Sequence, residues 1–320
     1  MSGKGKPSAA VGGQAVIEGV MMRGKRHWAL ACRRPDGTIS LHSEALTPLA
    51  DRFPILRKPV LRGVIGLWES LTLGIKTLSM SANESLGEEE RDISKKEMAL
   101  SLFIGILMAV GLFMALPWVV ASFGFHDPAS REGVLKNAVF VLTEGVIRIA
   151  ILVIYILVVS RIKQLRRVFE YHGAEHKTIH ALEAGVELTP KNVLQYSPVH
   201  PRCGTSFLLI VMVLAILVFA WVPNPGLSDW RLVLLIIASR VVGIPLIVGL
   251  SYEVIKFAGR HKDSTVMRII TYPGMLLQKL TTREPDEEQI EVAIRALEGV
   301  AALEPVEMDH EGKADVEVMA

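Results

Sequence analysis

The sequence predicts a mainly α-helical, polytopic membrane protein with four transmembrane helices and a small β-hairpin region near its N-terminus. Hydrophobic residues other than glycine make up 50% of the 320 residues, more than an ordinary soluble domain carries. Four apolar runs have the length needed to cross a bilayer, and they occupy residues 98–123, 134–160, 205–222 and 232–257. Residues 98–258 are therefore expected to form a four-helix membrane domain.

The distribution of Lys and Arg predicts the orientation of this domain. Residues 161–204, between the second and third runs, contain seven Lys or Arg residues, whereas residues 124–133 and 223–231 contain one arginine each. Positive charge is retained on the cytoplasmic side of a membrane, so residues 161–204 are expected to form a cytoplasmic loop. Four spans then place both termini in the cytoplasm and predict a multi-pass protein of the cytoplasmic membrane.

Residues 1–97 are expected to form a cytoplasmic N-terminal region that contains the β-hairpin. Two strands, at residues 27–34 and 38–45, flank a Pro-Asp-Gly turn of the kind that joins hairpin strands. Residues 12–24 before them are rich in glycine and are expected to form a loop. Two interpretations of this loop remain open: tight structural turns, or close approach of its backbone to a ligand or to the cytoplasmic loop.

The N-terminal region is also expected to contain an amphipathic helix at residues 57–83. Arg62, Glu69 and Lys76 follow one another at intervals of seven within an otherwise apolar helical pattern, and this spacing puts them on one face. The pattern predicts a helix that lies on the membrane or packs against the bundle, rather than one that spans the bilayer.

The cytoplasmic C-terminal region is predicted at residues 259–303. It begins with an amphipathic run that is interrupted at Pro273, and a soluble helix follows Pro285, with acidic residues in its first turn. Residues 304–320 are expected to be a disordered acidic tail.

Charged residues within the predicted spans are expected to be paired, because each costs ~2.5–3.5 kcal/mol at the centre of a bilayer. Glu144 and Arg148 are one helical turn apart and Arg240 is predicted at a similar depth, so these three predict a network that fixes helix packing. Glu253 differs because it lies near the cytoplasmic end of the fourth span. It is a candidate metal ligand, or a partner that orients a ligating histidine.

A candidate metal-binding motif lies in the cytoplasmic loop. His172-Gly-Ala-Glu175-His176 matches the pattern H-x-x-E-H, in which two histidines hold zinc and the glutamate can activate a bound water. The ordinary alternative is a solvated polar helix whose histidines only form hydrogen bonds. The density of donors favours the metal site, because four of the nine histidines lie at positions 172–200 and Cys203, one of only two cysteines, follows them.

Two further features extend this motif. If residues 171–184 form one helix, His180 lies on the same face as the two motif histidines, and Glu183 is close by. His200 and Cys203 form a second pair of donors. Imidazole with thiolate suits zinc, with iron as the alternative, better than magnesium or calcium.

Several segments together carry a resemblance to a known family. They are GGQAVIEGVMMRG, the pattern at residues 62–82, YHGAEHK, HPRCGTSF, the SYE of residues 251–253 and TTREPD. In these the chain resembles the YqhQ-like family of bacterial membrane proteins, a domain of unknown function described as predicted metal-dependent enzymes. The resemblance implies a bacterial membrane location and a metal-dependent activity, and it supplies no substrate. The residues that it implies for this activity are His172, Glu175, His176, His200 and Cys203.

Two functions remain open at this stage. The first is a metal-dependent hydrolase that acts at the cytoplasmic membrane surface, in which Glu175 is the general base and Arg202 stabilises developing negative charge. Its metal ligands would come from His172, His176, His200, Cys203 and Glu253. The second is a membrane scaffold or assembly factor, in which the same three histidines and Cys203 form a closed structural site.

The sequence predicts few binding partners. The lipid bilayer is predicted as a partner from the apolar runs, whereas a formal net charge of +2 gives no indication of nucleic-acid binding. The substrate or protein partner is unknown, and an oligomer is compatible with the sequence. A transporter of metal ions or small solutes ranks last, because few polar residues lie within the spans.

Overall fold

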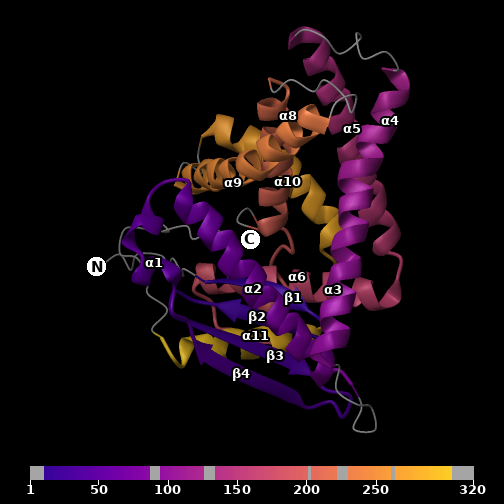
Figure 1. The fold of residues 1–320 in the computed structure, drawn as a ribbon. Helices are drawn as coiled ribbons and strands as arrows, with labels where there is room; N and C mark the ends of the chain where they lie inside the picture. The colour runs from indigo at the N-terminus through magenta and orange to yellow at the C-terminus, as the bar shows by residue number, and fades with distance from the viewer. Residues whose placement is uncertain are drawn as a thin grey trace.

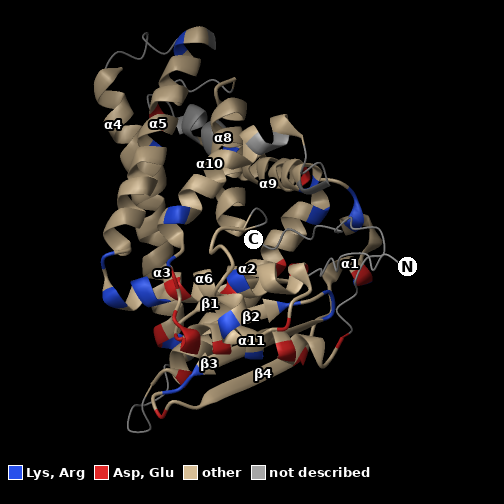
Figure 2. Ribbon diagram, turned by 180° about the vertical axis from the view of Figure 1, so that it is seen from behind, with Lys and Arg blue, Asp and Glu red and all other residues tan. Residues whose placement is uncertain are grey.

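The computed structural model describes residues 11–86, 94–125, 134–200, 203–221, 230–260 and 264–304. From residue 305 onward, the predicted acidic tail lies outside the described residues. The described chain divides into a body that contains a β-sheet and a bundle of apolar helices beside it (Figure 1). Figure 2 shows that charged residues gather on the body, whereas the bundle is mostly uncharged.

Four antiparallel strands form the sheet, and neighbouring strands follow one another along the chain. They are β1 (Gly12–Val16), β2 (Gly19–Arg23), β3 (His27–Arg33) and β4 (Ile39–Ala45). Strands β3 and β4 confirm the predicted hairpin. Gly37 in its turn has a φ of 86°, in the region of backbone conformation that favours glycine.

The prediction of a loop at residues 12–24 is wrong, because this segment forms β1 and β2. Strand β2 pairs with both of its neighbours, so that the sheet satisfies its backbone groups. Glycine permits the close packing: a Cβ atom on Gly19 would lie 2.4 Å from the carbonyl oxygen of Ala31 on β3. Gly19 therefore serves strand packing, whereas Gly13 approaches Glu175 of the predicted cytoplasmic loop, and periodicity could reveal neither contact in so short a segment.

The predicted amphipathic helix is α2 (Leu61–Glu84), and it joins the body to the bundle. Each of its three regularly spaced charges pairs with a different element. Arg62 binds Glu253 of α9 (Trp230–Arg260), Glu69 lies 3.1 Å from Arg23 of β2, and Lys76 lies 2.5 Å from Glu44 of β4. The charged face of α2 is therefore directed at protein partners rather than at water alone.

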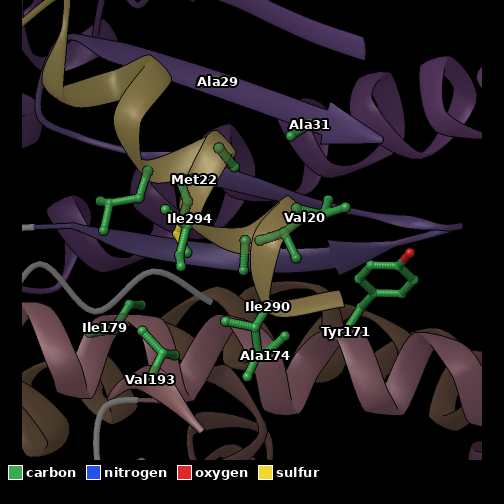
Figure 3. Close-up of a cluster of buried hydrophobic side chains, with 14 of the residues drawn as sticks. Val20, Met22, Ala29, Ala31, Tyr171, Ala174, Ile179, Val193, Ile290 and Ile294 are labelled. Carbon is green, nitrogen blue, oxygen red and sulfur yellow. The ribbon is translucent and has the colours of Figure 1, made fainter. Parts of the chain in front are cut away.

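The hydrophobic core of the body lies between the sheet and two helices, α6 (Lys163–Ala184) and α11 (Glu287–Ala301) (Figure 3). Residues 161–204, predicted as a loop, are thus largely helical. Asp286 caps α11 and exchanges hydrogen bonds with Gln289, and this confirms the predicted start of the helix. Figure 3 shows Tyr171 and Ala174 of α6 directed toward Ile290 of α11 and Val20 of β2.

Three helices in the described part of the chain are long and apolar enough to cross a membrane, so the prediction of four spans is wrong. The three apolar stretches are Lys96–Gly124, Leu135–Val159 and Ala238–Ala258. The third predicted span, at residues 205–222, is instead α8 (Gly204–Phe219), which has 16 residues. At about 1.5 Å per residue it is about 24 Å long, which is less than the ~30 Å hydrocarbon core of a bilayer.

The first of these apolar stretches combines α3 (Lys95–Val110), a π-helical turn η2 (Gly111–Ala115) and α4 (Leu116–Gly124), and the second belongs to α5 (Val134–Val159). Glu144 and Arg148 of α5 form the predicted pair, and Arg148 also donates to the carbonyl oxygen of Phe113 at 2.8 Å. Arg240 lies over the ring of Phe219, with 3.6 Å between the guanidinium carbon and the ring centroid. The charges therefore tie α5 to η2 and α9 to α8.

Helix α10 (Thr265–Thr281) continues through Pro273, where an interruption was predicted. Gly274 packs directly on α8, since a Cβ atom there would lie 2.7 Å from the side chain of Ser206. Three short helices are also described: α1 (Leu49–Arg52), η1 (Pro54–Arg57) and α7 (Pro190–Val193). The end of α10 reaches the histidine-bearing face of α6, where the carbonyl oxygen of Thr281 lies 2.8 Å from the Nδ1 of His172.

The core of the body predicts a large effect for Ile290→Ala. The Ile290 side chain is fully buried between the sheet and α6, so its truncation should lower the free energy of unfolding by about 2–5 kcal/mol. Denaturant unfolding of the full chain in detergent micelles measures this change. Leu303→Ala is the control, because Leu303 is 46% exposed. Equal effects of the two substitutions would contradict the described core.

Candidate metal centre

Helix α6 positions the motif residues, as the sequence predicted. It is continuous from Lys163 to Ala184 and ends at Gly185, whose φ of 67° is a common helix terminator. The rings of His172 and His176 lie 4.4 Å apart between centroids, one helical turn from each other. The opposite face of the helix is buried in the core of the body, so that these imidazoles cannot turn away from their common side.

Backbone carbonyls determine which ring nitrogens can bind a metal. The Nδ1 atom of His172 lies 2.8 Å from the carbonyl oxygen of Thr281, and that of His176 lies 2.6 Å from the carbonyl oxygen of Pro198. A carbonyl oxygen can only accept, so each Nδ1 carries the hydrogen and each neutral ring has its lone pair on Nε2. This hydrogen bond to a carbonyl is typical of histidines that bind metals through Nε2.

Cys203 brings a sulfur atom to the same place. It caps the N-terminus of α8, and its Sγ lies 3.3 Å from the Nε2 of His172. Ligand atoms of His172, His176 and Cys203 all lie within 4.8 Å of one another. On a tetrahedral zinc ion, nitrogen and sulfur ligands would be about 3.5 Å apart, within a few tenths of an ångström of the observed spacing. The donor set therefore fits zinc, or iron.

Glu175 is buried beside this group. Its Oε2 lies 3.5 Å from the Nε2 of His176, and its carboxylate accepts a hydrogen bond from the backbone of Gly13 on β1. A Cβ atom on Gly13 would lie 2.7 Å from the Cγ of Glu175, so the glycine-rich segment approaches the motif closely. Burial raises the pKa of the Glu175 carboxyl above its usual range. Burial therefore favours the protonated form of this carboxyl more than in an exposed glutamate.

The group opens on a cavity of about 460 Å³. His172, Glu175, His176 and Cys203 belong to the polar part of its lining, to which His200 also contributes. Apolar side chains of α2 and α6 form another part, and they are Leu71, Ile75, Leu78, Val168 and Phe169. The cavity can therefore accept a molecule that is apolar over much of its length, with a polar group directed at the donors.

The structure separates the other predicted site residues from this group. Glu253 is bound by Arg62, whose Nε lies 2.8 Å from its Oε1, and by the backbone N–H of Val60 at 3.2 Å. It contributes to the contact between α2 and α9 rather than to the histidine group. Arg202 lies outside the described residues.

His200 joins a different set of donors from the one predicted. Its Nε2 lies 3.6 Å from Glu183 Oε1, and with His180 these residues form a second group whose ligand atoms lie within 4.8 Å of one another. The sequence placed His180 and Glu183 on the motif face without assigning them as ligands. Their separation by three positions on one helix was the signal in the sequence that could have indicated a second pair of ligands.

Helix α10 supports both groups through residues that the sequence did not indicate. Gln278 accepts a hydrogen bond from the backbone N–H of His200 at 2.9 Å and donates to the Oγ of Ser206 at 2.8 Å. Gln278 is fully buried, and these two hydrogen bonds give its amide the partners that a buried polar group needs. No local pattern marks such a residue, because its partners come from distant parts of the chain.

Comparison with known proteins determines the family. The family model described as "Protein of unknown function (DUF1385)" matches residues 58–303. The chain belongs to this family. It is 34% identical over 314 residues to the uncharacterized protein YqhQ of Bacillus subtilis (strain 168), an alignment that covers 94% of this chain and 95% of that protein. No solved structure matches the chain. The resemblance to the YqhQ-like family is thereby confirmed.

The contact between β1 and α6 predicts that Gly13→Ala is destabilising. The added methyl group would meet the Cγ of Glu175 at 2.7 Å and the backbone oxygen of Met21 at 2.9 Å, so the free energy of unfolding should fall by about 1–3 kcal/mol. Gly66→Ala on α2 is the matched control, since its methyl group would meet nothing within 4 Å. Denaturant unfolding in detergent compares them, and an unchanged Gly13→Ala protein would contradict the contact.

Proposed function

We propose that the protein is a metal-dependent hydrolase of the bacterial cytoplasmic membrane, with zinc held by His172, His176 and Cys203. The convergence of these three donors at one end of a cavity carries the proposal. Three protein ligands leave a coordination position for water or substrate, which is the arrangement of catalytic zinc sites. Zinc bound there would supply Lewis acidity and would lower the pKa of a water molecule.

Glu175 would accept and donate protons beside the three metal ligands. Its carboxylate lines the cavity, and the backbone of Gly13 holds it in place. Burial favours its neutral form, so the carboxyl is a stronger base than an exposed glutamate once it has lost its proton. We therefore assign Glu175 the role of general base. The role proposed for Arg202 depends on residues outside those described.

The lining of the cavity suggests the class of substrate. Leu71, Ile75 and Leu78 form an apolar wall on α2, and each of them is also exposed on the surface of the protein. A substrate with an acyl or other lipid-like portion could lie along this wall and present an amide or ester bond to the donors. In this proposal the charged body, which holds β1 and α11 in one core, faces the cytoplasm.

A closed structural site in a membrane scaffold or assembly factor is the alternative. It would require His200 as a fourth ligand, and the ring of His200 lies 5.8 Å from that of His176 between centroids. A movement of a few ångströms would therefore complete the shell. The contact between His200 and Glu183 favours the open, three-ligand arrangement.

The proposed sulfur ligand predicts a spectroscopic signature. Cobalt bound in place of zinc should give an intense near-ultraviolet absorption band from charge transfer between thiolate and metal, and Cys203→Ser should abolish it. Cys32→Ala is the matched control, because Cys32 is buried in the sheet and burial raises its thiol pKa to about 12. A band that persists in Cys203→Ser and disappears in Cys32→Ala would exclude Cys203 as the ligand.

The proposed base predicts that Glu175→Gln retains cobalt and its charge-transfer band but loses at least about 100-fold in turnover. Hydrolysis of a panel of long-chain acyl amides and esters in mixed micelles, with wild-type protein beside the variant, measures this effect. A variant that turns over at the wild-type rate would remove Glu175 from the mechanism. Bound metal with no hydrolysis of any panel member would favour the structural site.

A further inference from the structure

A second group of metal-binding side chains lies beside the proposed hydrolase centre. It consists of His180 and Glu183, near the end of α6, and of His200 from the segment before α8. The rings of His180 and His200 lie 4.4 Å apart between centroids. His200 also lines the cavity, whereas His180 and Glu183 are not part of its lining, so the group lies at the edge of the space in which substrate would bind.

The spacing within this group suits a shared cation better than a direct hydrogen bond. The Nε2 of His200 lies 3.6 Å from the Oε1 of Glu183, which is beyond ordinary hydrogen-bonding distance. Nitrogen and oxygen ligands of a tetrahedral zinc ion would be about 3.4 Å apart. The His200 side chain is only 5% exposed and that of Glu183 only 24%, so few water molecules could separate them.

A backbone carbonyl also fixes the tautomer of His180, but here it binds Nε2 rather than Nδ1. Its Nε2 lies 3.0 Å from the carbonyl oxygen of Val199, which can only accept a hydrogen bond. In the neutral ring the hydrogen is therefore on Nε2 and the lone pair is on Nδ1. The carbonyl thus prepares His180 to bind a cation through Nδ1.

Three consecutive residues connect the two groups. The carbonyl of Pro198 orients His176, the carbonyl of Val199 orients His180, and His200 supplies a donor of its own. Gln278 of α10 holds the backbone of His200. A cation bound by His200 and α6 would therefore fix the segment that also sets the direction of His176.

We propose that His180, Glu183 and His200 bind a second divalent metal ion, which fastens residues 198–200 to α6. Two imidazoles and one carboxylate form a ligand set that zinc accepts, with iron(II) as the chemical alternative. The ion positions His176 of the first centre through the Pro198 carbonyl. The site does not depend on the first centre being a hydrolase.

Metal stoichiometry tests the second site. The full chain, purified in detergent, is saturated with zinc, freed of excess zinc by gel filtration and analysed by elemental mass spectrometry. We expect about two ions per chain in the wild-type protein and about one in His180→Ala and in Glu183→Gln. Glu187→Gln is the matched control, because Glu187 is an exposed carboxylate close to the end of the same helix, and it should retain both ions.

Cobalt absorption assigns the ion that each variant loses. The second group contains no sulfur, so His180→Ala and Glu183→Gln should keep the charge-transfer band of Cys203 while they bind one ion fewer. The retained band also shows that these variants are folded around the first centre. Loss of both the band and all metal in either variant would indicate that the variant has not folded. His200→Ala then decides the question: circular dichroism must show that it is folded, and it must bind one ion, or the proposal fails.

The outcomes separate the two proposals. A wild-type protein with about one ion, which is lost in Cys203→Ser and retained in His180→Ala, would overturn the second site and leave the first intact. One ion that is lost in His180→Ala and retained in Cys203→Ser would support the second site and remove the basis of the hydrolase proposal. Wild-type protein that binds no zinc under these conditions would overturn both.

Discussion

The packing of α6 is the constraint on which the rest of the structure depends. Tyr171, Ala174 and Ile179 bury one face of this helix against the sheet and α11. Because the side chains of a helix have fixed angular positions, burial of that face also sets the direction of His172 and His176. A helix with the same histidines but without the core could rotate, and its donors would not meet a common ligand. The hydrophobic core therefore determines in which direction the histidines of the candidate centre point.

Burial of polar groups around α6 is possible because distant segments supply their hydrogen-bond partners. Thr281 of α10 and Pro198 offer backbone carbonyls to two imidazoles, and Gly13 of β1 offers its N–H to Glu175. Each of these groups would cost about 1–3 kcal/mol if it were buried without a partner. The candidate centre is consequently assembled from the sheet, α6, α8 and α10 together, and no single element contains it.

Helices α8 and α2 connect the body to the bundle, and their contacts determine where the cavity lies. Helix α8 is capped by Cys203, inside the candidate centre, and its 16 residues are too few to cross a bilayer core. Its apolar surface instead packs against α5, α9 and α10. Charges of α2 bind both the sheet and Glu253 of α9, which holds the body close to the apolar helices. The cavity consequently lies where polar donors and an apolar wall meet.

Local chemistry in the sequence determined the long helices, the β3–β4 hairpin, the cap at Asp286 and the donors His172, Glu175, His176 and Cys203. These features depend on residue types at fixed short spacing, and such spacing keeps its meaning in any fold. The tertiary structure decided that Glu253 binds Arg62, that His200 joins Glu183, and that residues 12–24 form strands against α6. Each of these outcomes depends on a partner far away along the chain. Periodicity and spacing carry no information on which distant backbone or side chain will satisfy a buried polar group.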